Sequence, residues 1–177
     1  MTTTLTAEMP ARSSGHGLDF EALYRSARDD VYAYVATLLR DRAAAEDVTA
    51  AAFERAFRKQ DTYKAGRGSE RAWLFGIARN SALDELRRRK RSAALVSEPA
   101  DTRATAPEDA VETALRRAAV RVALACIDPR ERELVALKFH AGLDNAEIAT
   151  VLGVSVSNAG TQLHRAMTKL REAVDNA

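Results

Sequence analysis

Hydrophobic residues recur every three or four positions along most of this chain, which is the spacing of amphipathic helices. The pattern begins near Leu18 and predicts a first helix over residues 19–39. A second helix is expected from Asp41, a favourable N-cap residue, to about Lys59. Residues 1–17 mix Thr, Ser, Gly and Pro without a helical period, and we predict a disordered tail there.

Two glycines, Gly66 and Gly68, interrupt the pattern before a third helix. Ser69 is suited to cap that helix, which is predicted to continue into the basic run of residues 87–91. Residues 18–91 are therefore predicted to form a first domain, a bundle of three or four helices. On a helical wheel, the core-facing stripe of the third helix contains Leu74, Phe75, Ala78, Ala82 and Leu86.

Residues 92–107 are predicted to be a flexible linker because they hold two prolines and several small polar residues but no apolar period. From residue 92 to residue 113 there are five acids and one base, so this part of the chain is acidic. The whole chain has a net charge of only +2. Residues 108–177 are predicted to form a second domain.

The second domain contains the pattern of a helix-turn-helix. A short helix is expected after Asp144, Gly153 suits the left-handed residue that ends it, and a longer helix follows to about Val174. Acidic or hydroxyl N-cap residues mark the helix starts in this domain: Asp128 with Glu131, Asp144 with Glu147, and Ser155.

One arc of the last predicted helix carries polar and basic side chains and no acids. Such side chains can contact phosphates and base edges in a major groove. An ordinary amphipathic helix with a solvated face has the same spacing, and His164 has the alternative of a surface histidine without a role. The predicted reading face contains Ser157, Asn158, Thr161, Gln162, His164, Arg165 and Lys169.

The third helix has a second face on which an aromatic residue accompanies basic residues. Trp73, Asn80, Asp84, Arg87 and Arg91 share this arc, and residues 79–91 contain six bases and two acids. An indole beside arginines favours unstacked nucleic-acid bases, which stack on the ring while the guanidinium groups follow the phosphates. The alternative is a half-buried core tryptophan beside a solvated basic helix end.

Composition agrees with an all-α chain, because Gly is 8 and Pro only 4 among 177 residues. The single Cys126 excludes an internal disulfide, is predicted to be a small buried hydrophobe, and suits a reducing cytoplasm. No apolar run is long enough for a membrane span. We find no pattern for a metal site, cofactor, small-molecule substrate or catalytic nucleophile, and therefore do not expect an enzyme.

These features together resemble the extracytoplasmic-function (ECF) group of bacterial sigma factors, over about residues 18–175. No single motif suffices, but their order and spacing agree. The motifs are AEDVT at 45–49, FERAF at 53–57, AWLFGIARN at 72–80, DELRRR at 84–89, PREREL at 129–134, AEIA at 146–149, LGVS at 152–155 and LHRA at 163–166.

The resemblance implies a transcription initiation factor that binds core RNA polymerase and promoter DNA and melts the duplex without ATP. It implies that the reading face contacts the minus-thirty-five duplex. For docking on core polymerase it implies Glu46, Asp47, Thr49, Phe53 and Phe57, although helix-bundle packing is the alternative for the two phenylalanines. For the melted minus-ten strand it implies Lys64, Arg67, Ser69, Trp73, Asn80, Asp84, Arg87, Arg88 and Arg91.

The resemblance leaves open whether an anti-sigma factor holds the chain inactive, as one does in many relatives. It also implies that the acidic linker lies in the RNA path of the polymerase, with a plain tether as the alternative. The chain departs from the family pattern at Ala50 and Ala51, where relatives carry Gln-Glu, and at Gly160 and Gln162, where they carry Lys or Arg. We therefore expect altered polymerase contacts and an unusual promoter preference.

Two other functions remain compatible with parts of the sequence. A polymerase-independent repressor or activator would use the same helix-turn-helix, but it would need dimer symmetry and would not need Trp73 beside arginines. A helical interaction protein without a nucleic-acid role would leave the basic faces as solvated surface.

Overall fold

The computed structural model describes residues 18–95 and 122–175, and within these ranges every regular element is helical. The predicted all-α fold class is confirmed. Residues 122–126 are helical, and the other elements are α1 (Phe20–Leu39), α2 (Arg42–Arg58), two 3₁₀ turns (Gln60–Thr62 and Ala65–Arg67), α3 (Glu70–Leu95), α5 (Pro129–Phe139), α6 (Asn145–Leu152) and α7 (Val156–Asp175).

The helix starts of the first domain follow the predicted caps. An oxygen of Asp41 accepts from the backbone N–H of Ala44 at 3.1 Å, and the Ser69 hydroxyl accepts from the N–H of Ala72 at 3.1 Å. Between them the chain turns at Gly68, whose φ of 140° favours glycine. Each cap satisfies an N–H that has no partner inside its helix.

The third helix is longer than predicted. It ends at Leu95, so residues 92–95 are helical and do not belong to an extended linker. The reason is intrinsic propensity, because Ala and Leu follow Ser92 and the first proline comes only at Pro99. The remaining predicted linker and the predicted N-terminal tail lie outside the described residues.

α1, α2 and α3 pack into a three-helix bundle. Tyr34 and Val35 of α1 are fully buried against Leu74, Phe75 and other residues of the predicted core stripe of α3. The rings of Tyr34 and Phe75 meet edge to face, 5.4 Å apart. Burial of these large side chains is the main source of stability in the bundle.

The second domain has the predicted helix-turn-helix. Asp128 with Glu131 and Asp144 with Glu147 both form complete capping boxes, and Gly153 ends α6 with a φ of 69°. The Ser155 hydroxyl accepts from the N–H of Asn158 at 3.2 Å. α7 buries Ala159, Leu163 and Ala166, so the opposite face of this helix is left for solvent.

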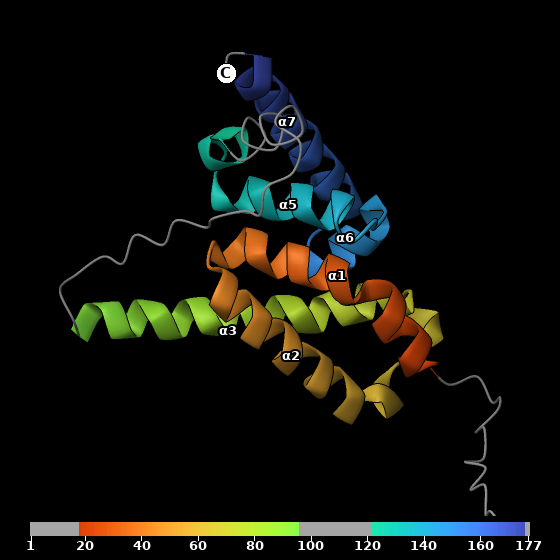
Figure 1. Cartoon of the computed structure of the whole chain (residues 1–177). Coiled ribbons are helices and arrows are strands. Elements are labelled where there is room, and N and C mark those ends of the chain that lie inside the picture. The colour runs from red at the N-terminus through yellow and green to blue at the C-terminus, as the bar shows by residue number, and fades with distance from the viewer. Residues whose placement is uncertain (1–17, 96–121, 176–177) are drawn as a thin grey trace, which may run out of the picture.

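The two domains pack directly on each other. α5 lies against α1, and α6 lies against α3, so the second domain forms an upper layer on the first (Figure 1). Leu134 and Leu137 of α5 and Ile148 of α6 belong to the same continuous hydrophobic cluster as the core of the first bundle. The sequence predicts two separate modules, whereas the structure shows them in a closed arrangement.

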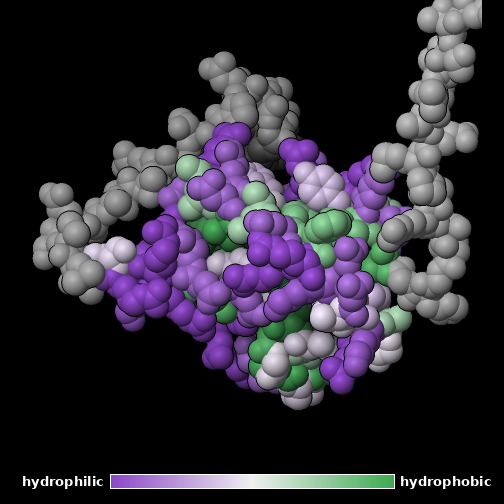
Figure 2. All heavy atoms as spheres, turned by 90° about the horizontal axis from the view of Figure 1, so that it is seen from below, coloured by the Kyte–Doolittle hydropathy of each residue, from purple (hydrophilic) through white to green (hydrophobic). Residues whose placement is uncertain are grey.

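Cys126 is exposed, which corrects the prediction of a buried side chain. Ala123 and Ile127, four residues apart, occupy the inward face of this turn and direct Cys126 outward. Seen from below the first domain, the surface is largely hydrophilic, with hydrophobic residues in smaller patches (Figure 2). Within residues 18–95 and 122–175, no helix has the length and apolar character needed to cross a bilayer.

Candidate nucleic-acid interface

A groove of about 400 Å³ runs along the start of α3 and gathers five of the nine predicted minus-ten residues. The 3₁₀ turns supply one wall and α3 the other. The lining combines aromatic rings with polar and basic groups, as a site for unstacked bases requires. Its lining includes Tyr63, Lys64, Arg67, Ser69, Trp73, Gly76, Ile77 and Asn80 of the first domain and Thr150 and Val151 of the second.

Trp73 is held in the groove by an aromatic neighbour. The rings of Tyr63 and Trp73 lie 5.7 Å apart at 60°, an edge-to-face contact. The Tyr63 hydroxyl donates to the carbonyl of Gly68 at 3.2 Å, which fixes the loop beside the indole. Desolvation and the nearby charge of Glu70 raise the pKa of Tyr63. Trp73 itself is half-buried, so part of its surface is accessible.

The helix-turn-helix covers one side of this groove. Thr150 and Val151 of α6 contribute to its lining, and the hydroxyl of Ser69 donates to the carboxylate of Glu147. The start of α3 and the start of α6 therefore meet through their capping residues. A base that stacked on Trp73 would compete with α6 for space.

An ion pair with a buried carboxylate also joins the two domains. The Nε atom of Arg79 on α3 donates to Glu133 of α5 at 2.7 Å, and the Tyr34 hydroxyl donates to the same carboxylate at 3.2 Å. The Glu133 side chain is only 8% exposed. Burial and the Glu133 charge raise the pKa of Tyr34 well above its usual value.

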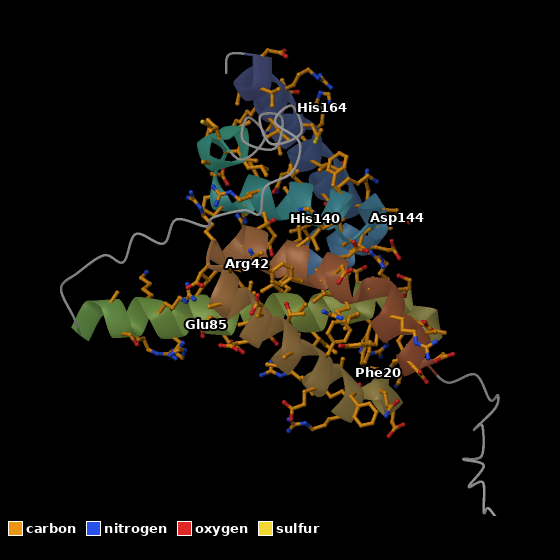
Figure 3. The ribbon with its side chains drawn as sticks, viewed as in Figure 1. Phe20, Arg42, Glu85, His140, Asp144 and His164 are labelled. Carbon is orange, nitrogen blue, oxygen red and sulfur yellow. The ribbon has the colours of Figure 1, made fainter. Side chains whose placement is uncertain are left out.

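A second arginine reaches from α3 to the second domain. Arg71 pairs with Asp30 of α1 and donates to the carbonyls of His140 and Ala141, at the end of α5. Figure 3 shows His140 at the level where α5 faces α1. Burial lowers the pKa of His140, and the Asp30 charge opposes that shift.

Most of the basic run on α3 is already paired with acids. Arg87 donates to Asp84 at 3.0 Å, and Glu85 accepts from both Arg88 and Arg89. These two arginines lower the pKa of Glu85 to about 2. The fixed positive charge is therefore smaller than the residue count suggests, although an exposed pair such as Arg87 with Asp84 is weak enough to exchange for a phosphate.

The free cations lie at the two ends of this surface. Lys64 and Arg67 at the groove, and Lys90 and Arg91 at the far end of α3, are exposed and have no acid partner within residues 18–95 and 122–175. The structure thus brings Lys64, Arg67, Ser69, Trp73 and Asn80 together. Asp84, Arg87, Arg88 and Arg91 lie further along the same helix, outside the groove lining.

Six of the seven predicted minus-thirty-five residues are exposed on α7, and Gln162 is half-buried. In Figure 3, His164 lies on α7 in the upper layer, away from the first domain. The Gln162 amide donates to the side-chain oxygen of Asn158 at 2.7 Å. Lys169 pairs with Glu131 of α5 and is therefore less available to a phosphate than its exposure suggests.

The predicted polymerase-docking residues divide between surface and core. Glu46 and Asp47 are exposed on α2, and Phe57 is 56% exposed with its ring 5.2 Å from Phe20. Thr49 and Phe53 are buried, so the packing interpretation of Phe53 is confirmed. Both nevertheless line a groove of about 500 Å³ between α1 and α2, and the Thr49 hydroxyl has no hydrogen-bond partner in the described part of the chain.

Sequence reasoning missed the residues that act between the domains. Tyr34, Arg79 and Glu133 lie in predicted helices and Tyr63 follows the second predicted helix, but none of the four was predicted to make these contacts. The signal for Glu133 was weak, because it lies in the first turns of a predicted helix, within the alternating charges Arg130-Glu131-Arg132-Glu133 that are typical of an exposed helix start. The capping-box pattern does identify Glu147, but not its contact with Ser69.

An aromatic and basic groove on a helical bundle, beside a helix-turn-helix with an exposed polar face, defines a two-domain helical nucleic-acid-binding protein. The sequence comparisons agree with this class. Residues 23–92 match the family model of Sigma-70 region 2, and residues 117–170 match that of Sigma-70, region 4.

Curated relatives extend the match over most of the chain. The ECF RNA polymerase sigma factor SigL of Mycobacterium tuberculosis is 32% identical over 166 residues, which cover 91% of this chain and 94% of SigL. BldN of Streptomyces coelicolor is 34% identical over 160 residues, and the match spans 89% of this chain but only 61% of BldN. The chain belongs to the ECF RNA polymerase sigma factors.

Solved structures support the fold. The sigma factor RpoE of Bartonella quintana, in complex with the anti-sigma factor NepR, superposes with a TM-score of 0.75 at 22% identity, over 89% of this chain and 97% of that chain. CnrH in complex with the cytosolic domain of CnrY superposes with a TM-score of 0.62 at 25% identity, over 89% and 88% of the two chains.

Proposed function

We propose that this chain binds core RNA polymerase in the cytoplasm, reads minus-thirty-five and minus-ten elements, and stabilises the melted strand at its promoters. Membership of the ECF sigma factors supports promoter-specific transcription as its function. The observation that carries the finer proposal is the groove at Trp73, where an accessible indole lies beside Lys64, Arg67 and Asn80. Nucleotide polymerisation itself is the work of the polymerase.

Strand separation follows from differential binding. The groove accepts a base only after it has left the duplex, so binding of the melted strand shifts the duplex towards the open form without ATP. Each base stacked on an aromatic side chain contributes about 1–3 kcal/mol. This is comparable with the loss of one base-pair stacking step, about 1.4 kcal/mol, so a few such contacts are enough to favour melting.

The closed arrangement must open before this happens. Val151 and Thr150 of α6 occupy one side of the groove, and the contact between Glu147 and Ser69 closes its end. In the proposed active form the two domains separate, so that α7 reaches the upstream duplex while the groove at Trp73 holds the melted strand. Binding to core polymerase supplies the free energy for separation.

The contacts with protein partners are proposed from exposed residues and from the solved relatives. Glu46, Asp47 and Phe57 on the exposed side of α2 form the docking surface for core polymerase, with Thr49 and Phe53 in the adjoining groove. An anti-sigma factor is proposed as a further partner, because the two solved relatives are in complex with NepR, an anti-sigma factor, and with the cytosolic domain of CnrY.

Reconstitution tests the proposal. Purified protein and core polymerase are expected to form a holoenzyme that gives discrete transcripts from a subset of promoters. A Phe57→Ala variant should lower holoenzyme formation, whereas Val174→Ala, which also removes an exposed hydrophobic side chain, should not. Absence of holoenzyme, together with tight binding of a palindromic site by the protein alone, would instead support a polymerase-independent regulator.

A further inference from the structure

The first two turns of α7 present neutral amides where a reading helix most often presents cations. Asn158 and Gln162 are one turn apart, and Ser157 and Thr161 lie beside them on the exposed side. No acid or base occurs between Val156 and Leu163. The first positive charge on this face is Arg165, and Lys169 is paired with Glu131. Base contacts from the first two turns of α7 must therefore come from amide and hydroxyl groups.

The two amides are joined in a defined orientation. The Gln162 Nε2 atom donates to the Asn158 Oδ1 atom at 2.7 Å, and the Asn158 backbone N–H is occupied by the Ser155 hydroxyl at 3.2 Å. The bond leaves Gln162 with one N–H and its carbonyl oxygen, and leaves Asn158 with its NH₂ group and one oxygen lone pair. Each amide thus still offers one donor and one acceptor side by side.

A paired donor and acceptor distinguishes adenine from guanine in the major groove. Adenine presents the N6 donor beside the N7 acceptor, which an amide matches with two hydrogen bonds. Guanine presents two acceptors, O6 and N7, which a guanidinium matches and an amide does not. Thr161 is exposed and precedes Gln162, and its methyl group suits the methyl group of the thymine that pairs with adenine.

Gly160 lies on the side of α7 that faces α6, because the nearest atom to a Cβ there would be the side-chain nitrogen of Asn145 of α6, at 3.4 Å. The position carries no charge, so it adds no cation to the first two turns of α7.

We propose that Asn158 and Gln162 are specificity-determining residues that read adenine in A·T base pairs of the upstream duplex, while Arg165 contacts phosphate. This inference rests on the proposed function, because it needs α7 in the major groove of a promoter. It predicts that the two base pairs of the upstream promoter element that contact Asn158 and Gln162 are A·T.

The test uses holoenzyme and a promoter library randomised across the upstream element. Wild-type holoenzyme should enrich adenine at two positions, and Gln162→Arg should change one of them to guanine. The preference at that position should move by about 5- to 100-fold, the range expected for one bidentate contact. Asn158→Ala should remove the preference at the other position.

A matched control separates base reading from added charge. Val174→Arg adds the same cation at the exposed far end of α7, beyond the predicted reading face, and it should leave the selected bases unchanged. Selection of guanine by the wild type, or an unchanged selection by Gln162→Arg, overturns the inference but leaves the proposed function intact. If wild-type holoenzyme selects no upstream sequence at all, the proposed function of α7 fails as well.

Discussion

Arg79 of the first domain and Glu133 of the second form an ion pair of 2.7 Å in the contact between α3 and α5. The carboxylate is nearly buried, and Tyr34 gives it a further hydrogen bond. Both domains therefore contribute to one polar cluster in the interface between them. Because α6 of the second domain lines the groove at Trp73, we expect an ion pair that stabilises the closed arrangement to limit access of DNA to that groove.

Glu133→Gln should shift the protein from the closed towards the open arrangement. The substitution keeps the volume but removes a charge whose hydrogen bonds contribute about 1.5–3 kcal/mol. Energy transfer between dyes at Cys126 and at a cysteine introduced at exposed Lys59 reports the separation of the domains. The transfer efficiency should fall for Glu133→Gln. It should stay unchanged for Glu54→Gln, which loses an exposed pair with Arg58, and an equal value in wild type and Glu133→Gln would contradict this role.

Asp144→Ala should destabilise the helix-turn-helix by about 1 kcal/mol, because Asp144 accepts from the Glu147 N–H and completes a capping box. Chemical denaturation measures the loss. Asp29→Ala is the matched control, since its carboxylate is 98% exposed and makes only a 4.0 Å contact with Arg28. Equal stability of the two variants would show that the box at the start of α6 contributes nothing.

Glu85 predicts a defined pH dependence of stability. Its pKa falls from 4.5 to about 2 because Arg88 and Arg89 donate to the carboxylate. A lowered pKa in the folded state stabilises the fold above pH 4.5, and this contribution is lost as the pH falls from about 4.5 to about 2. The difference in unfolding free energy between wild type and Glu85→Gln should therefore shrink across that window. A difference that is constant with pH would argue against the arginine pairs as its cause.

Arg165→Ala should weaken upstream binding by holoenzyme and lower the slope of log K against log salt by about 1, as the loss of one phosphate contact requires. Arg171→Ala removes an equal charge from the end of α7, beyond the predicted reading face, and should leave the slope nearly unchanged. Equal slopes in wild type and Arg165→Ala would exclude Arg165 from the duplex contact.

Local structure could be predicted from the sequence because each signal acts within one helix turn. Asp41, Asp128, Asp144 and Gly153 specify their caps through bonds to neighbouring residues. The buried stripe of α3 follows from helical spacing. The extension of α3 to Leu95 was missed because the linker was placed from its prolines and small polar residues, which outweighed the helix-forming Ala and Leu after Ser92. The exposure of Cys126 was missed because helical spacing alone does not fix which residues of one short turn face inward.

The candidate site was only partly predictable. The pattern identifies Trp73 and Asn80 because they lie on one face of α3, whereas Lys64 and Arg67 were implied only by the family resemblance. It does not predict Tyr63 against the indole or α6 over the groove, because these contacts depend on how separate elements pack. Charge counting also overstates the basic run, since Glu85 and Asp84 neutralise arginines three or four residues away.

The effect of Trp73 substitutions on promoter opening by the holoenzyme tests the central proposal most directly. Permanganate reactivity of thymines around the minus-ten element should be strong with wild-type holoenzyme, and Trp73→Phe should retain much of it. With Trp73→Ala the reactivity should fall about 5- to 100-fold, the equivalent of one lost stacking contact, while the closed complex measured in the cold binds as before. Equal loss of closed and open complexes, or full opening by Trp73→Ala, would contradict the assignment of the groove to the melted strand.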